Sequence, residues 1–363
     1  MSERIVPQPT MENVRISGLE ELQAHLQELV YDHTLPFNAK LFDDVELQLT
    51  EDNIPPLLPS FLPSLTTILK STTQDPTPCL TLTIKLLSPL SLARTLTVAD
   101  PPSLITALQS PLPGANHLAL AILHKGAATP SDAAILSTLP EVIEELVEAW
   151  LSTDNVGVAE KAAKVLGDLL EVDCDVVAPP PQPLASATDS TTQELVRRRR
   201  TPGYARLWKL IFGSRPILSL FPQYCSPSDE RTTHQVTLSQ GRLLRLLPRL
   251  AALNLDPLID VSAPLIFGRE SLLYWASLKM IDYDDVLVHL NLVDFFETLV
   301  SVMRVAETRS DIVDEEVGAL IRTAAKNDTV LRAALRGLPD RTIEEEAEPL
   351  REYITKLFHG RIE

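Results

Sequence analysis

Hydrophobic residues recur at helical spacing in the first periodic segment of the chain. Four leucines are separated by three, four and three residues: Leu19, Leu22, Leu26 and Leu29. This spacing places them on one face of an α-helix. Ser17 stands just before them, where a residue that caps the first backbone N–H groups is expected. The pattern predicts an amphipathic helix with Ser17 as its N-cap.

The same period continues through most of the chain, with Pro, Asp or Gly between the periodic segments. It predicts many helices of about three turns joined by short connections. No alternation of apolar and polar residues bounded by hairpin turns is found, which argues against a sheet. The expected helices are 57–70, 78–96, 101–110, 114–125, 131–139, 141–152, 157–171, 203–225, 236–253, 269–280, 284–308, 313–325, 328–337 and 343–358.

Prolines mark the expected helices in two ways. Pro130 and Pro140 stand at helix starts, where the missing N–H costs nothing because first-turn donors have no intrahelical partner. Pro63 and Pro248 fall inside apolar helical runs, which we expect them to kink. In helical repeat proteins, each pair of short helices buries its apolar face against the next pair. The predicted fold is all-α, a HEAT/armadillo-like α-solenoid.

The composition changes abruptly at residues 173–196, which are rich in proline, serine and threonine. Such a composition favours a long loop or flexible linker, which we expect to be mobile and cleaved first by proteases. The predicted organisation is a helical-repeat block at 1–172, a linker at 173–202 that ends in the basic run Arg197–Arg200, and a second helical-repeat block at 203–363.

The formal net charge of −17 is unevenly distributed. Residues 1–196 carry 9 basic and 26 acidic side chains, whereas residues 197–250 carry 11 basic and 2 acidic ones. This asymmetry is an argument about partners, not about the fold.

Within the basic segment, Arg242, Arg245 and Arg249 are separated by three and four residues and share one helix face. Leu247 lies on the opposite, core side. The arginines form either a solvated face or a basic row in a groove that receives an acidic partner surface. Together with Arg206, they are the candidate partner-binding residues.

A search for catalytic chemistry returns no motif. Phosphate-binding loops, dinucleotide fingerprints, zinc-protease motifs and nucleophile elbows are all absent from the sequence. The three cysteines are far apart, without C-x-x-C spacing, which disfavours a disulfide framework or a thiolate zinc site. His117 and His124 could share a helix face as metal ligands, but no second cluster completes a site. We therefore expect a non-enzyme without catalytic, cofactor-binding or metal-binding residues.

The N-terminus, MSERIVPQPTMENVRI, lacks the apolar core of a secretory signal, and no stretch of 18 apolar residues follows. We expect an intracellular monomer, in the cytoplasm and also in the nucleus, that does not bind membranes.

Four stretches resemble a known family: CLTLTIKLLSPLSLARTL (79–96), EKAAKVLGDLLEVD (160–173), YARLWKLIFGSRPILSLF (204–221) and SQGRLLRLLPRLAAL (239–253). They are similar to the fungal branch of the HEAT/armadillo-like assembly chaperones of the proteasome regulatory particle. Some members of that branch also carry a DNA-mismatch-repair label. The resemblance implies that the chain binds the C-terminal helical domain of one base ATPase subunit in its concave face, has other base subunits as further partners, and dissociates after assembly.

A helical scaffold for DNA repair or chromatin is the alternative, suggested by the basic segment and the second family label. Against it, a net charge of −17 repels a polyanion, and the sequence has no helix-turn-helix or zinc signature. We do not expect nucleic acid to be a partner.

Overall fold

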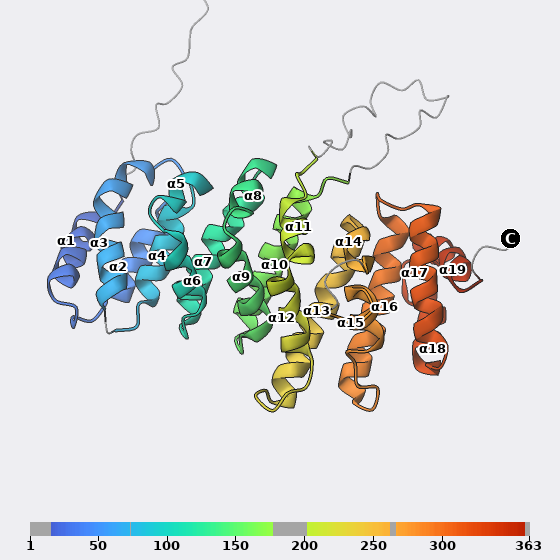
Figure 1. Cartoon of the computed structure of the whole chain (residues 1–363). Coiled ribbons are helices and arrows are strands. Elements are labelled where there is room, and N and C mark those ends of the chain that lie inside the picture. Colours follow the sequence, from blue (N-terminus) through green and yellow to red (C-terminus); the bar gives the residue numbers. More distant parts are fainter. Residues whose placement is uncertain (1–15, 73, 177–201, 262–265, 360–363) are drawn as a thin grey trace, which may run out of the picture. The chain divides into compact units, whose positions relative to one another are not determined.

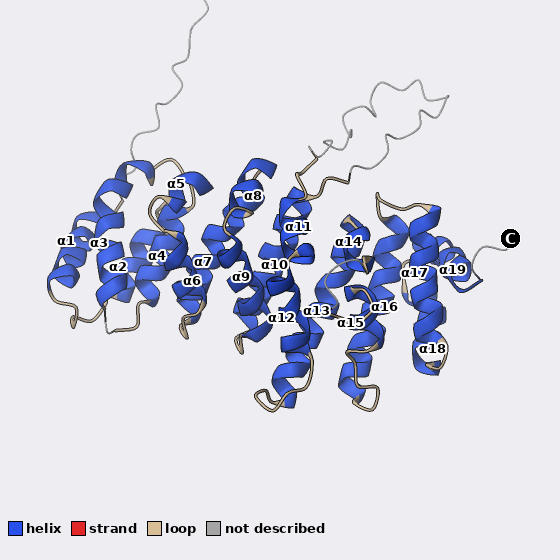
Figure 2. Ribbon diagram, in the orientation of Figure 1, coloured by secondary structure: helices blue, strands red, loops and turns tan. Residues whose placement is uncertain are grey.

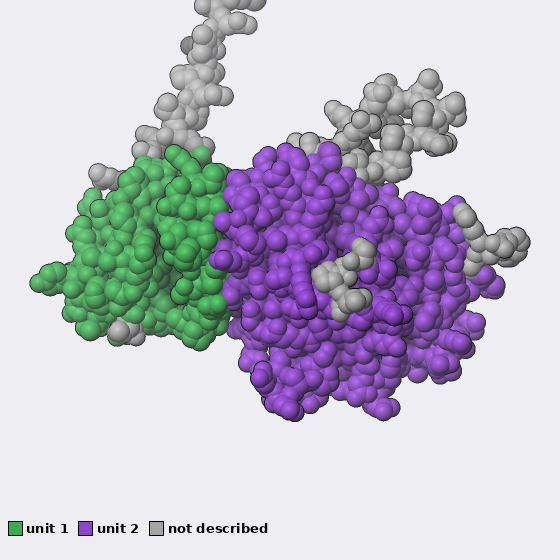
Figure 3. Space-filling view, in the orientation of Figure 1, with its two compact units in different colours: residues 1–122 green, residues 123–363 purple. Residues whose placement is uncertain are grey.

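The computed structural model describes residues 16–72, 74–176, 202–261 and 266–359. Within these residues the protein has 19 α-helices and no strand (Figures 1 and 2), which confirms the expected all-α class. The chain divides into two compact units, unit 1 at residues 1–122 and unit 2 at residues 123–363 (Figure 3).

Unit 1 is built on a core of inward-facing leucine, isoleucine and phenylalanine side chains. Leu22, Leu26 and Leu29 are buried in it, as the leucine spacing predicts. Its elements are α1 (Leu19–Tyr31), α2 (Ala39–Glu46), a 3-10 turn η1 (Pro55–Leu57), α3 (Leu58–Ser71), α4 (Thr77–Leu87), α5 (Leu92–Leu96), α6 (Pro101–Leu108) and most of α7 (Pro113–His124).

The start of α1 differs from the expectation, and Ser17 as its N-cap is wrong. Gly18 occupies the N-cap with a φ of 80°. Glycine adopts this left-handed conformation without steric cost, so the chain turns there into the helix. Ser17 instead donates its N–H to Oε1 of Gln48 at 2.8 Å.

Prolines in unit 1 act differently according to position. The expected helix 78–96 is broken into α4 and α5 around Pro89, and Ser91 caps α5 with its side chain. Pro63, by contrast, lies inside α3 and does not end it.

Unit 2 contains a row of three helices, α10 (Val156–Asp173), α13 (Thr233–Leu253) and α16 (Val286–Val305). α13 packs against α10 on one side and against α16 on the other. The other elements are η2 (Lys125–Ala127), α8 (Pro130–Leu136), α9 (Pro140–Ser152), α11 (Arg206–Gly213), α12 (Arg215–Cys225), α14 (Asp256–Ile259), α15 (Leu272–Leu278), α17 (Asp311–Ala325), α18 (Thr329–Gly337), η4 (Pro339–Arg341) and α19 (Glu344–His359).

The expected helix 203–225 is two helices, because α11 ends at Gly213 and α12 starts with Pro216 in its first turn. Pro248 lies inside α13, which continues through it over 21 residues. Leu247 is fully buried, so the predicted core side of α13 is confirmed.

The boundary between the compact units lies at Ile122 and Leu123, whereas the expected linker 173–202 falls within unit 2. Residues 177–201, which include the basic run Arg197–Arg200, lie outside the described residues. On the two sides of this segment, α10 and α11 pack together. The chain ends that flank it also meet, because Gly203 donates its N–H to the carbonyl oxygen of Cys174 at 2.7 Å.

The buried side chain of Asp173 explains how the two flanking helices are joined. Its Oδ2 accepts the backbone N–H groups of Leu207 at 2.6 Å and Trp208 at 3.4 Å, at the start of α11. Burial raises the pKa of Asp173, although the backbone donors favour its charged form. The last residue of α10 therefore caps the first turn of α11.

Candidate partner-binding surface

Arg242 is held inside unit 2 by the end of α9. Its guanidinium group donates to three backbone carbonyl oxygens, those of Trp150 (3.2 Å), Leu151 (2.9 Å) and Thr153 (2.6 Å). Carbonyl groups in the last turn of a helix have no intrahelical partner. Burial lowers the pKa of Arg242. This arginine joins α13 to α9 and is not a free member of a basic row.

Arg249 is engaged by acidic residues of α10. Its Nη2 lies 2.7 Å from Oδ1 of Asp168 and 2.6 Å from Oε2 of Glu171. Oδ2 of Asp168 also lies 2.9 Å from Nζ of Lys164 and 2.7 Å from Nε2 of His124. Burial alone would raise the pKa of Asp168, but the hydrogen bonds from its three partners outweigh burial and lower it.

Arg245 is exposed and forms no hydrogen bond or ion pair with another described residue. Arg206, at the start of α11, is also exposed, with its guanidinium carbon 5.5 Å from the centroid of the Tyr204 ring. The three arginines of α13 thus divide into two that fix neighbouring helices and one that is accessible to a partner. Spacing on a single helix could not reveal this division.

The exposed side of α16 carries an apolar area that the sequence analysis missed. Its first residues, Val286, Leu287 and Leu290, are exposed, whereas Val288 and Leu292 are buried. The segment is apolar on nearly all sides, so hydrophobicity alone did not distinguish its outward face. The available signal was helical spacing: Leu290 lies three and four residues after the other two exposed residues, and the two buried residues are four apart.

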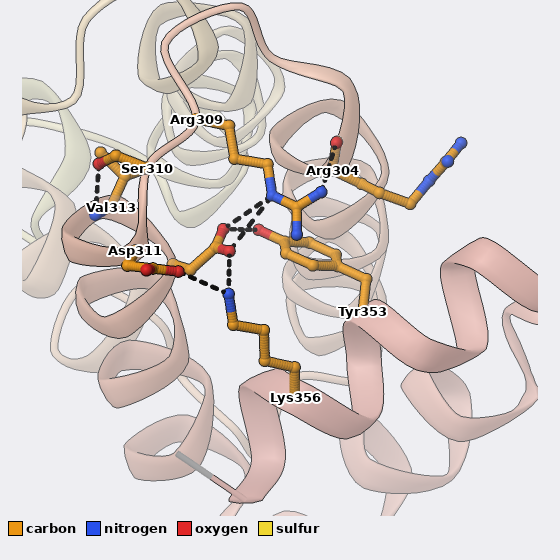
Figure 4. A network of polar contacts seen from close by, with 8 residues as sticks. Arg304, Arg309, Ser310, Asp311, Val313, Tyr353 and Lys356 are labelled. Carbon is orange, nitrogen blue, oxygen red and sulfur yellow. Dashed lines mark hydrogen bonds and ion pairs between the residues drawn. The ribbon is translucent and has the colours of Figure 1, made fainter. Parts of the chain in front are cut away.

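A polar network at the C-terminal end of unit 2 is structural (Figure 4). The buried carboxylate of Asp314 accepts hydrogen bonds from Arg309 Nε (3.2 Å), the Tyr353 hydroxyl (3.0 Å) and Lys356 Nζ (2.8 Å). Burial, together with the Asp314 charge, raises the pKa of Tyr353. With all its partners present, this network fastens α19 to α17.

Metal-binding clusters and reactive thiols are two features that would indicate catalysis. The described residues contain no group of three or more His, Cys, Asp or Glu side chains placed to hold a metal ion. Cys79, Cys174 and Cys225 are buried and none of them is in a disulfide, and burial raises the pKa of the Cys79 and Cys225 thiols to about 12. Such thiols carry almost no thiolate, the reactive form, at neutral pH.

Among the described helices, α16 is the one that is long and apolar enough to cross a membrane. Of its most apolar 18-residue window, 44% is buried inside the protein, and the helix packs along α13. The core helix of a globular unit has the same properties.

No family model matches the chain, and no curated protein matches it.

Proposed function

We propose that this protein is a HEAT/armadillo-like α-solenoid that acts, without catalysis, as an assembly chaperone. Its partner is the C-terminal domain of a base ATPase subunit of the proteasome regulatory particle. We further propose that the chain is a monomer and that it acts in the cytoplasm and the nucleus. The family resemblance of four stretches between residues 79 and 253 supports the partner, and the helical architecture is compatible with the solenoid.

The observation that carries the proposal is the row of helices α10, α13 and α16 in unit 2. Rows of aligned helices are the surfaces that repeat proteins use to bind other proteins. Arg245 is exposed in the middle helix of this row and has no partner among the described residues, so it is available to an incoming acidic group. A fixed charge of this kind steers encounter and sets the register of a complex.

Holding a partner requires no covalent step. The chain would cover a surface of the ATPase domain that later docks elsewhere, which delays docking until the base is assembled. Release would then follow from competition for the same surface.

The DNA-repair scaffold gains no support from the described residues. Arg242 and Arg249 belong to the basic segment, but both are engaged by carbonyl or carboxylate groups of the chain itself. Their charge is therefore not free for phosphate contacts.

The test is direct binding of the full chain to the isolated C-terminal domain of each base ATPase subunit, by titration calorimetry. One domain should bind, and Arg245→Glu should weaken that binding about tenfold, or ~1.4 kcal/mol. Arg215→Glu is the matched control, because it makes the same charge change at an exposed position of α12 and should leave the affinity unchanged.

A single reversal is sharper than reversal of all three α13 arginines, since Arg242 and Arg249 also hold the fold together. If no ATPase domain binds, the proposed function is wrong. If one domain binds the wild type and both variants equally, the function stands and the contact surface does not include Arg245.

A further inference from the structure

An apolar patch lies where the turn before α16 meets the first turns of that helix. We define the α16 patch by four side chains and their exposed fractions: Tyr283 (43%), Val286 (69%), Leu287 (71%) and Leu290 (53%). Val286 and Leu290 are four residues apart, and Leu287 lies between them on the same outward side of the helix. Large exposed apolar patches, especially those with a polar rim, mark interaction sites on protein surfaces.

The patch continues toward α18. Nε2 of His289 lies 2.6 Å from Oδ2 of Asp328, which caps the start of α18 through Leu331. The ring of Tyr283 packs against His289 with a centroid distance of 5.7 Å. Val330, two residues beyond Asp328, is itself exposed. The base of the patch is therefore held in place by the contact between His289 and Asp328, and its apolar surface is presented on fixed helices.

The rim of the patch is acidic. Asp282, Asp284 and Asp294 are exposed around it. Residues 280–303 contain no lysine or arginine, although Lys279, 3.9 Å from Glu270, is exposed just before them and Lys326 is exposed two residues before Asp328. A partner segment that fits this surface must bring apolar side chains to the centre and positive charges to the edge.

We propose that the α16 patch binds a basic amphipathic helix of a protein partner. Leucine-like side chains of that helix would cover Val286, Leu287 and Leu290, while its lysines or arginines would face the three aspartates. This is the helix-on-apolar-surface mode of recognition, with charges that select the partner. The patch is distinct from Arg245, which suits an acidic group, and the inference does not require the partner to be an ATPase.

The acidic rim also argues against two other occupants. A second copy of the chain would place two acidic rims against each other, at a net charge of −17 per copy. An anionic membrane surface would be repelled for the same reason.

The test uses fluorescently labelled synthetic helical peptides with leucine on one face and lysine on the other, or with glutamate in place of lysine. Anisotropy is measured on titration with the full chain. The lysine peptide should bind and the glutamate peptide should not. The double variant Leu287→Ser/Leu290→Ser should weaken binding by at least about tenfold. These side chains are exposed, so circular dichroism and melting temperature should not change.

The matched control is Tyr31→Ser/Leu47→Ser, which removes two exposed apolar side chains from unit 1 and should bind like the wild type. A second variant, Asp282→Asn/Asp284→Asn/Asp294→Asn, should weaken binding and reduce its salt dependence.

Three results would overturn the inference. One is unchanged binding of the lysine peptide to the leucine variant, and another is equal binding of the two peptides. The third is a wild-type dimer in sedimentation that the leucine variant abolishes, since a second copy would then be the occupant. Because no ATPase is present, these results are independent of the proposed function.

Discussion

Arg249 and Asp168 form an ion pair, with Nη2 2.7 Å from Oδ1, that joins α13 to α10. The guanidinium group of Arg249 also contacts Glu171. The carboxylate of Asp168 also contacts Lys164 and His124. A residue selected from the sequence as a contact for a partner is thus part of the internal structure of unit 2.

The lowered pKa of Asp168 predicts a pH-dependent contribution to stability. Its carboxylate stabilises the folded state above its ordinary pKa of ~3.9, and this contribution is lost as the pH falls toward the lower folded pKa. Asp168→Asn should lower the free energy of unfolding by about 1 kcal/mol at pH ~7, and by clearly less at pH ~2, well inside the window between the unfolded and folded pKa values. Urea titrations at both pH values measure this. Asp294→Asn, at an exposed position of α16, is the control, and an equal loss at both pH values would contradict the assignment.

Arg242 should matter for stability more than its place in a basic row suggests. Arg242→Ala leaves three carbonyl oxygens at the end of α9 without a charged donor, and should cost about 1.5–3 kcal/mol. Arg245→Ala removes an equivalent side chain from the exposed side of the same helix and should change the free energy of unfolding by less than ~0.5 kcal/mol. Equal losses in chemical denaturation would show that the carbonyl contacts contribute nothing.

Gly203 is predicted to be intolerant of a side chain. A Cβ atom there would lie 2.1 Å from the carbonyl carbon of Asp173, so the backbone on one side must move. Gly203→Ala should destabilise unit 2 by about 1–3 kcal/mol. A Cβ atom at Gly213 would have no atom within 4 Å, and Gly213 lies in the last turn of α11, where alanine is favoured over glycine. Gly213→Ala should therefore leave the stability unchanged or raise it by up to ~1 kcal/mol. The melting temperatures of the two variants test this prediction. A lower melting temperature for Gly213→Ala than for Gly203→Ala would contradict it.

Leu247 tests the packing of α13. Leu247→Ala truncates a fully buried side chain and should cost about 2–5 kcal/mol. Leu287→Ala removes the same atoms from an exposed position of α16 and should change stability by less than ~0.5 kcal/mol. The two variants are compared by guanidinium titration, and a small loss for Leu247→Ala would mean that the site is not packed.

The sequence by itself determined the all-α class and the core side of individual helices. Leu22, Leu26 and Leu247 are buried as their spacing requires, because helical periodicity is a local property of a few turns. It did not determine all helix ends. Gly18, not Ser17, is the N-cap of α1, and the backbone N–H of Ser17 instead bonds to Gln48, a residue 31 positions later.

Only the tertiary structure decided which polar residues are free. Arg242 and Arg249 look equivalent to Arg245 on one helix, but their partners come from residues about 80 to 90 positions earlier. Asp173 likewise caps a helix that starts more than thirty residues later. Hydrogen bonds and ion pairs between distant segments depend on how helices pack, and helical spacing carries no information about that packing.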